Sequence, residues 1–501
     1  EALNVELTTG ALISAVAMVA TKKVDIGKSV RDWILSLSRF VYHSGHPVWD
    51  DDQRFKRVSK EYRSVALAFL SLTLKLLLIV AIIFIAVGVT TAILEVGRGD
   101  ADSYFTTANW TRLLFPPYLL HWPFLVGTLA PLILAPLISG PLLTGKTSQD
   151  PAAVSTPYSV MDKFLHYVFL GNQPIARGLF GLECLIKRRR LKQPRAHVYV
   201  SGLARSGSTS FMQYLAQLPG YRSLSYRNMP LIFMPQTGLK LVSKEKGSEQ
   251  ERSHQDGMTH SLDTHEALEE PFWLHFCGGD YVKDAQLVRH EIPPKVHDKY
   301  KTFRALTAHG QVYLAKNNNH LLRASSLHDL DTRQGLVTRT IIPFRAPLAQ
   351  AKSLLRQHQS LSNMQQSDNF FLDYMDFLGH YEFGIHIKTS TLETDSSLKP
   401  PQQSPTTVEY WLDVWNQFYE KAYDLYQGQP EFCFFCYESY LQNPKASLEK
   451  LLAFLDVSDD AVDALDVQEW TGQSLTMPNE NEVDEKYRIT YSKMAKAALN
   501  A

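Results

Sequence analysis

The residues best placed to do chemistry lie between His197 and Ala216. An apolar, β-rich run is followed by a turn at Gly202, a loop of small residues and a helical pattern that begins at Ser208. A strand, a loop and a helix in this order present backbone N–H groups and a helix N-terminus to a phosphate. The donors expected in this loop are Arg205, Ser206, Gly207, Ser208, Thr209 and Ser210.

The spacing of Gly202 and Gly207 is that of the G-x-x-x-x-G-K-[ST] loop of nucleotide-binding proteins, with one difference. Ser208 stands where that motif has a lysine, and the only cation of the loop is Arg205. The loop would therefore bind an anion but lack the ammonium that reaches the β- and γ-phosphates of ATP. A plain Gly/Ser turn between a strand and a helix is the alternative interpretation of this stretch alone.

A second strand-and-helix pattern covers residues 339–355. Apolar Ile341 indicates the strand, and Pro347 falls at the start of the helix, where its missing N–H costs nothing. Arg345 offers a planar guanidinium to a phosphate, and Ser353 adds a hydroxyl donor from the helix. The sequence therefore predicts a second phosphate site, formed by Arg345 and Ser353.

Together the two stretches resemble the donor site of sulfotransferases that use 3′-phosphoadenylyl sulfate (PAPS). In that family a Lys or Arg precedes a Ser-Gly-[Ser/Thr]-[Ser/Thr] run, as Arg205 does here. Its 3′-phosphate motif is Arg-Asp-Pro with a Ser eight residues after the Arg, matched by Arg345, Pro347 and Ser353. Ala346 replaces the usual Asp, a departure that affects the ordering of the Arg345 loop rather than phosphate binding itself. The resemblance covers roughly residues 195–460 and implies PAPS as co-substrate, with no metal.

The segment 254–273 resembles the acceptor side of a bacterial-type group of these enzymes. The matching positions are His254, Asp256, Gly257, Asp263, Glu266, Ala267, Glu269, Glu270 and Trp273. The family uses a Glu or a His as base, so the candidates are, in order, Glu270, Glu269 and His254, with Asp256, Glu266 and Trp273 on the substrate side. On a helix, Glu266, Glu269, Glu270 and Trp273 would share one face. A solvated acidic helix is the alternative, and the spacing of the three histidines fits no common metal site.

Three shorter motifs carry less information. The strand-like run that ends in Lys316 resembles the family's strand before the 3′-phosphate unit, so Lys316 would contact substrate or PAPS, or cap a strand end. Tyr437 and Glu438 match a late family segment and are expected to be structural. The CxxC of Cys433 and Cys436 lies in an aromatic, strand-like run, which indicates buried thiols rather than a redox site.

The chain has 501 residues, zero formal net charge and 4 cysteines. A neutral chain gives no general argument for binding nucleic acid, and so few cysteines exclude a disulfide-built scaffold.

The N-terminal part contains membrane signals. Residues 65–94 are apolar with a single charge, Lys75, and are predicted to form a transmembrane helix. Residues 116–143 are uncharged but contain six prolines, which predicts a second crossing or a re-entrant segment. Two crossings, with basic residues on both flanks, place the following domain in the cytoplasm. A single crossing would place that domain in a lumen.

The predicted architecture is α/β: a P-loop-type, three-layer αβα domain with a parallel sheet, preceded by transmembrane helices. Its expected parts are a mixed helical region at 1–64, a membrane region at 65–145, a basic connector at 146–195 and a catalytic domain at 196–501. The predicted function is a membrane-anchored sulfotransferase that acts on a hydroxyl or amine of a lipid, glycolipid, carbohydrate or other small acceptor at the bilayer. The alternatives are a P-loop kinase or NTPase, and a non-catalytic membrane protein on a sulfotransferase scaffold.

Overall fold

The computed structural model describes residues 15–16, 19–20, 23–96, 158–241, 250–251, 259–260, 268–394, 399–457 and 483–500. The chain divides into two compact units. One is made of Glu1–Ser44, Asp51–Ala153 and Pro157–Val168, and the other of Gly45–Asp50, Val154–Thr156 and Phe169–Ala501.

The N-terminal unit is built on a helix pair. Helix α2 (Ile26–Ser44) packs along helix α3 (Asp51–Val96), with the rings of Trp33 and Phe69 6.2 Å apart. Lys75, the single charge of the apolar run, donates from Nζ to Ser29 Oγ of α2 at 2.8 Å. The charge thus has a polar partner on the neighbouring helix.

Helix α3 is longer than the apolar run predicted it to be. It begins at Asp51 and includes the charged residues before the run, because Lys, Arg and Glu are good helix formers and Asp51 and Asp52 favour a helix N-terminus. Among the described residues, Asp51–Ile83 is one stretch long and apolar enough to cross a membrane. The predicted second segment, 116–143, lies outside the described residues.

The C-terminal unit contains the central sheet. Its five strands follow the order β2-β6-β1-β7-β9, and every neighbouring pair is parallel. The strands are β1 (His197–Val200), β2 (Tyr221–Arg222), β6 (Val312–Lys316), β7 (Thr338–Phe344) and β9 (Phe432–Cys436). The small pairs are β3 (Gln250–Glu251) with β4 (Thr259–His260), antiparallel, and β5 (Gln286–Val288) with β8 (Thr389–Thr391), parallel.

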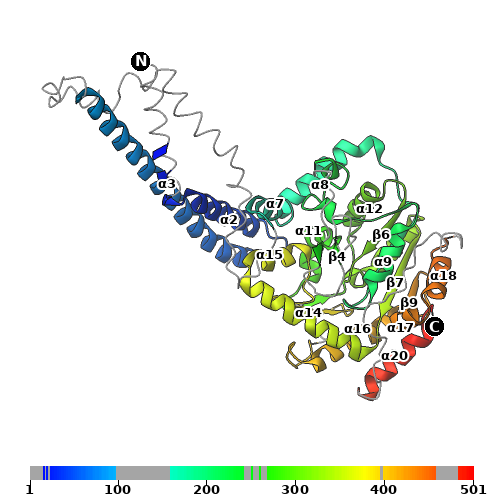
Figure 1. The fold of residues 1–501 in the computed structure, drawn as a ribbon. Helices are drawn as coiled ribbons and strands as arrows, with labels where there is room; N and C mark the ends of the chain where they lie inside the picture. Colours follow the sequence, from blue (N-terminus) through cyan, green and yellow to red (C-terminus); the bar gives the residue numbers. More distant parts are fainter. Residues whose placement is uncertain are drawn as a thin grey trace. The chain divides into compact units, whose positions relative to one another are not determined.

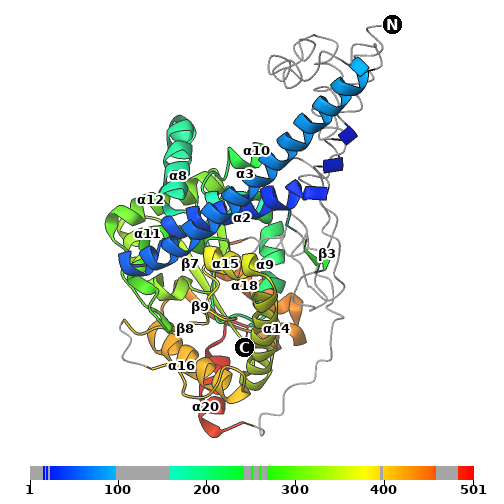
Figure 2. The same ribbon diagram turned by 90° about the vertical axis from the view of Figure 1, so that its left-hand side faces the viewer.

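Helices and short 3-10 turns precede, connect and follow these strands in the sequence (Figure 1), and the first of them, α7, belongs to the N-terminal unit except for its last residue. They are α7 (Val160–Phe169), α8 (Gln173–Lys187), η3 (Arg188–Arg190), α9 (Ser208–Gln217), η4 (Tyr226–Asn228), α10 (Gly238–Leu241), α11 (Glu270–Tyr281), α12 (Pro294–Ala308), η5 (His320–Leu322), α13 (Ala324–Arg333), α14 (Pro347–Ser367), α15 (Asn369–Leu378), α16 (Val408–Tyr426), α17 (Tyr437–Gln442), α18 (Pro444–Phe454) and α20 (Glu485–Ala497). Helices α14, α16 and α20 lie side by side in both views (Figure 1, Figure 2).

Side chains alternate across β1, so that the two faces of the sheet have different cores. Val198 and Val200 pack into one apolar cluster with Met212 of α9 and Leu451 of α18. Tyr199 points to the opposite face, where its hydroxyl lies 2.9 Å from that of Tyr300 on α12. The fold is therefore mixed α/β around a parallel sheet, as the sequence predicted.

Strand β1 lies at the point where the strand order turns. The chain visits β2 and β6 on one side of β1 and then β7 and β9 on the other. In open α/β sheets, ligands bind outside the carboxyl ends of the strands at such a point. The loop that follows Val200 occupies this position.

Candidate active site

The loop between β1 and α9 has the geometry of an anion-binding turn. Arg205 (φ 65°) and Gly207 (φ 84°) are both left-handed, and no side chain caps the N-terminus of α9 at Gly207. The first N–H groups of a helix need partners, and a bound anion is one of them. The Ser206 hydroxyl is fully buried and makes no hydrogen bond to the described residues, although it lies near the Tyr419 hydroxyl. The loop thus has a buried hydroxyl group, that of Ser206, next to a helix N-terminus that no side chain caps.

Gly207 also has no space for a side chain. A Cβ there would overlap the ring of Tyr437, which covers the loop. The glycine is therefore required twice, by its backbone conformation and by the close approach of Tyr437.

The two predicted phosphate motifs meet in space. Arg205 Nε donates to Ser353 Oγ at 3.1 Å, although the two residues are 148 positions apart. Ser353 is buried on α14, the helix that begins at Pro347, as predicted. One arginine of the loop thus reaches the hydroxyl assigned to the 3′-phosphate motif.

Lys316 joins the same site from β6. Its Nζ donates to Thr209 Oγ1 of α9 at 2.9 Å. Lys316 is the last residue of β6, and β6 pairs with β1, so its side chain lies at the carboxyl edge beside the loop. Of the two roles that the sequence left open for Lys316, this contact favours participation in the site.

Gln350 connects the loop to the Arg345 segment. Its Nε2 donates to Ala204 O at 2.9 Å, and its Oε1 accepts from Arg345 N at 3.3 Å and from Trp415 Nε1 at 3.0 Å. Sequence reasoning missed this residue, because a glutamine one helical turn into α14 has no motif of its own.

Glu438 orders the segment in which Ala346 stands where the sulfotransferase motif that the sequence resembles has an Asp. Its Oε1 accepts from Ala346 N at 3.0 Å and lies 3.9 Å from Arg345 Nε. The ring of Tyr437 lies 5.2 Å from the Arg345 guanidinium carbon, a cation–π distance. Burial raises the pKa of Glu438, while the Ala346 N–H and the charge of Arg345 oppose this rise. A carboxylate from another part of the chain therefore holds the Arg345 loop.

The two adjacent glutamates of the acceptor-side segment are enclosed in the core. Glu270 begins α11 and makes a bidentate ion pair with Arg323 at 2.8 and 3.0 Å. The Arg323 guanidinium also lies over the Trp273 ring at 4.7 Å. The buried charge of Glu270 is thus neutralised by a buried arginine.

Glu269 is equally buried and surrounded by donors. It accepts from Trp273 Nε1 at 2.7 Å, from Tyr313 Oη at 2.8 Å and from Asn317 Nδ2 at 3.3 Å. Asn317 also donates to Glu270 Oε2 at 2.9 Å. The two glutamates therefore fix the backbone just after Lys316. The predicted face that would line a cleft is instead packed in the interior at Glu269, Glu270 and Trp273.

Some predicted residues cannot be placed. His254, Asp256 and Glu266 lie outside the described residues, and the Ser210 side chain is likewise not described. Ser208 begins α9 and is buried. Cys433 and Cys436 are buried free thiols of β9, as predicted. No cluster of three or more potential metal ligands occurs among the described residues.

Solved bacterial sulfotransferases are similar in structure to this chain. Sulfotransferase STF1 from Mycobacterium tuberculosis is 13% identical with a TM-score of 0.36, over 67% of this chain and 87% of that one. Sulfotransferase STF9 from Mycobacterium avium is 13% identical with a TM-score of 0.36, over 73% and 94%. A sulfotransferase from Alicyclobacillus acidocaldarius is 13% identical with a TM-score of 0.27, over 62% and 94%. No family model and no curated protein matches the chain.

Proposed function

We propose that the protein is a membrane-anchored sulfotransferase that moves a sulfuryl group from PAPS to a hydroxyl or amine. The observation that carries this proposal is the convergence of Arg205, Ser353 and Lys316 at the N-terminus of α9. These three residues come from motifs that are far apart in the chain, and together they place positive charge and hydrogen-bond donors at one edge of the sheet. A phosphosulfate ester with a separate 3′-phosphate needs such an edge.

The roles of the residues follow from their positions. The loop residues 206–210 would hold the 5′-phosphate with N–H groups and hydroxyls, and the buried Ser206 hydroxyl fits this role. Arg345 and Ser353 would hold the 3′-phosphate. Arg205 would neutralise the charge that develops on the leaving oxygen, assisted by Lys316. When bound, PAPS supplies the activated sulfuryl group, and the chain supplies position and charge.

The acidic segment has a supporting role in this proposal. Among the predicted bases, Glu269 and Glu270 are held by Trp273, Tyr313 and Arg323 in the interior, a setting that suits positioning of the strand end at Lys316. His254, Asp256 and Glu266 are proposed on the acceptor side from the family pattern alone.

The membrane anchor is the α3 segment. Its apolar side chains from Leu67 to Ile85 include many that are more than 45% exposed, as a lipid-facing helix requires. We propose that the catalytic unit is cytoplasmic and that the acceptor is a lipid, glycolipid or carbohydrate at the bilayer. Reporter fusions at the C-terminus would test the topology: activity of a cytoplasm-only reporter supports it, and activity of a lumen-only reporter contradicts it.

The reaction itself is tested by isotope transfer. The full chain in lipid vesicles is incubated with PAPS labelled with ³⁵S, and in parallel with ATP labelled with ³²P at the γ-phosphate. Label in a lipid or glycan product from PAPS alone supports the proposal. Label from ATP alone would establish the kinase alternative, and label from neither would favour a scaffold without catalysis.

A further inference from the structure

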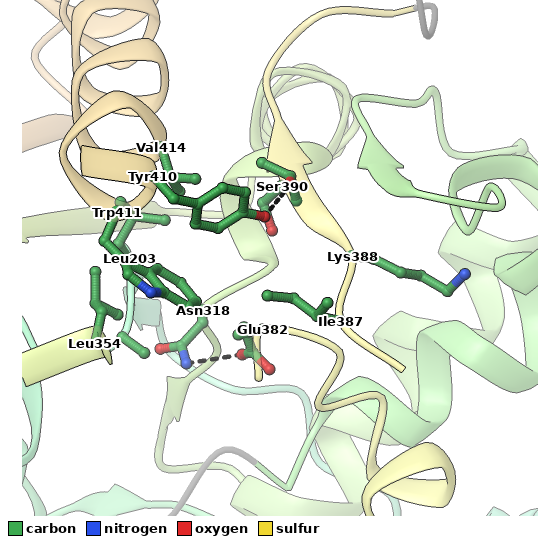
Figure 3. A pocket seen from close by; sticks show the side chains of 12 residues that line it. Leu203, Asn318, Leu354, Glu382, Ile387, Lys388, Ser390, Tyr410, Trp411 and Val414 are labelled. Atoms are coloured by element: carbon green, nitrogen blue, oxygen red, sulfur yellow. Dashed lines mark hydrogen bonds between the residues drawn. The ribbon is translucent and has the colours of Figure 1, made fainter. Parts of the chain in front are cut away.

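A pocket adjoins the donor loop. Leu203 and Ala204 of the loop line it, together with Leu354, Trp411, Asn318 and Glu382 (Figure 3). The loop residues that border the pocket directly precede Arg205. A molecule in the pocket would therefore lie next to the groups that hold the sulfuryl donor.

Glu382 is the one acidic side chain that lines this pocket among the described residues. Its side chain is 10% exposed, and Oε1 accepts from Asn318 Nδ2 at 2.9 Å. Oε2 is buried and makes no hydrogen bond to the described residues, although His380 Nδ1 lies 3.6 Å away. A buried carboxylate oxygen without a hydrogen bond is rare, and it indicates a missing partner.

The carboxylate is ionised at neutral pH. Burial alone would raise the pKa of Glu382, but the neighbouring His380 and the hydrogen bond from Asn318 hold this pKa below its usual value. An ionised carboxylate with an open acceptor position can accept a hydrogen bond from a hydroxyl group.

The same chain segment connects this carboxylate to the donor site. Lys316 contacts Thr209 of α9, and Asn318, two residues later, donates to Glu382. The segment is fixed between them by Asn317, which binds both core glutamates. Movement of Glu382 relative to the donor loop is restricted by these contacts.

The residues that line the pocket suit an apolar alcohol or phenol. Leu203, Leu354 and Trp411 provide apolar and aromatic surface. The volume of the pocket is about 20 Å³, which holds one water-sized group, so only the hydroxyl end of an acceptor would enter. The Lys388 amine points away from the pocket (Figure 3) and donates to the carbonyls of Lys283 and Asp284. An acceptor with a carboxylate at this end would meet Glu382 without a compensating cation.

We propose that this pocket receives the hydroxyl end of an apolar alcohol or phenol and that Glu382 is the base that takes its proton. The inference rests on the proposed sulfotransferase function and names the acceptor class of the same site. The acceptor O–H bond breaks and its proton moves to the carboxylate of Glu382. The acceptor oxygen forms a bond to sulfur while the bond from sulfur to the phosphate oxygen breaks, and the electron pair leaves on that oxygen beside Arg205. Glu382 thus takes the role of base, for which the sequence offered Glu270, Glu269 and His254.

The test uses the full chain in detergent with ³⁵S-labelled PAPS and three acceptor probes, 2-naphthol, 1-octanol and octanoic acid. We expect transfer to 2-naphthol or 1-octanol and none to octanoic acid. Glu382→Gln should lower kcat at least about 100-fold, the usual effect of losing a general base. The acid limb of the pH–rate profile should disappear in this variant. The control Glu420→Gln, at an exposed position of α16, should keep the wild-type rate.

Binding measurements separate the inference from the proposed function. Calorimetry with 3′-phosphoadenosine 5′-phosphate (PAP) should give the same Kd for wild type, Glu382→Gln and Val414→Trp. Val414→Trp fills the pocket and should abolish binding of 2-naphthol to the PAP complex. If Glu382→Gln keeps more than a third of the rate, or if wild type binds PAP but sulfates neither hydroxyl probe, the inference is wrong while the donor site stands. If wild type binds no PAP and transfers no label, the proposed function itself fails, and the inference fails with it.

Discussion

Arg205 Nε donates to Ser353 Oγ at 3.1 Å, which joins a loop after the first strand to a helix 148 residues later. The loop belongs to the proposed 5′-phosphosulfate site and the serine to the proposed 3′-phosphate site. Because one side chain reaches between them, we expect the two proposed phosphate positions to be coupled.

This coupling predicts non-additive effects on PAP binding. Arg205→Ala, Ser353→Ala and Arg345→Ala should each weaken PAP binding about 10- to 100-fold, the value of a hydrogen bond to a charged group. The double variant of Arg205 and Ser353 should lose less than the sum of the single losses, because the two residues are in contact. Arg356→Ala, at an exposed position of the same helix, is the control and should bind normally. Losses that add within about 0.3 kcal/mol would contradict the coupling.

Gly207→Ala should abolish PAP binding and destabilise the fold. The substitution places a methyl group at φ 84° and into the ring of Tyr437. Gly220→Ala is a matched control, since its φ is 86° and no atom lies within 4 Å of the added Cβ. Urea unfolding should show a loss of about 1 kcal/mol for Gly220→Ala and a clearly larger loss for Gly207→Ala. Equal losses would mean that Tyr437 does not cover the loop.

Replacing Ala346 with aspartate, the residue of the sulfotransferase motif that this segment resembles, should destabilise the protein. Ala346 is 2% exposed and its N–H already donates to Glu438, so an aspartate side chain here would bury a second negative charge beside the first. Ala346→Asp should lower the free energy of unfolding by about 3 kcal/mol. Adding Glu438→Gln should restore most of the lost free energy of unfolding, because the repulsion between the two buried carboxylates is removed. A stable single variant would show that the loop does not depend on Glu438.

Stability should fall as the pH falls below about 6.5. Burial lowers the pKa of His275 and of His328 to about 4 and that of His197 to about 3, so these side chains stay neutral in the folded state. The unfolded chain takes up these protons at about pH 6.5, and each such histidine costs about 1.4 kcal/mol per pH unit below that value, down to its folded pKa. Urea unfolding between pH 7.5 and 4.5 measures this slope. His275→Gln should reduce it and exposed His309→Gln should not; a flat profile would contradict the buried neutral histidines.

Local signals made part of this structure predictable. The units that begin at His197 and Thr338 follow strand and helix patterns, with Gly207 and Pro347 at their turns, and they fold as those patterns indicate. The contact between Arg205 and Ser353 could be expected only from the family pattern, since no local rule brings them together.

The remaining features depend on residues that are distant in sequence. The acids at Glu269 and Glu270 indicate a polar face, but Arg323, which neutralises one of them, is 53 positions away. Likewise Glu438, which accepts a hydrogen bond from the Ala346 N–H, is 92 positions away in the sequence. Glu382 carries no motif at all, and only the packing of the fold places it beside Asn318.

The loop and α14 are proposed to bind a nucleotide with phosphates at both ends, and calorimetry on the full chain in detergent tests this binding most directly. PAP and ATP are titrated in parallel, with Ser206→Ala and Arg345→Ala as variants. We expect micromolar affinity for PAP, little affinity for ATP, and loss of PAP binding in both variants. Tighter binding of ATP than of PAP, or PAP binding that survives Arg345→Ala, would contradict this proposal.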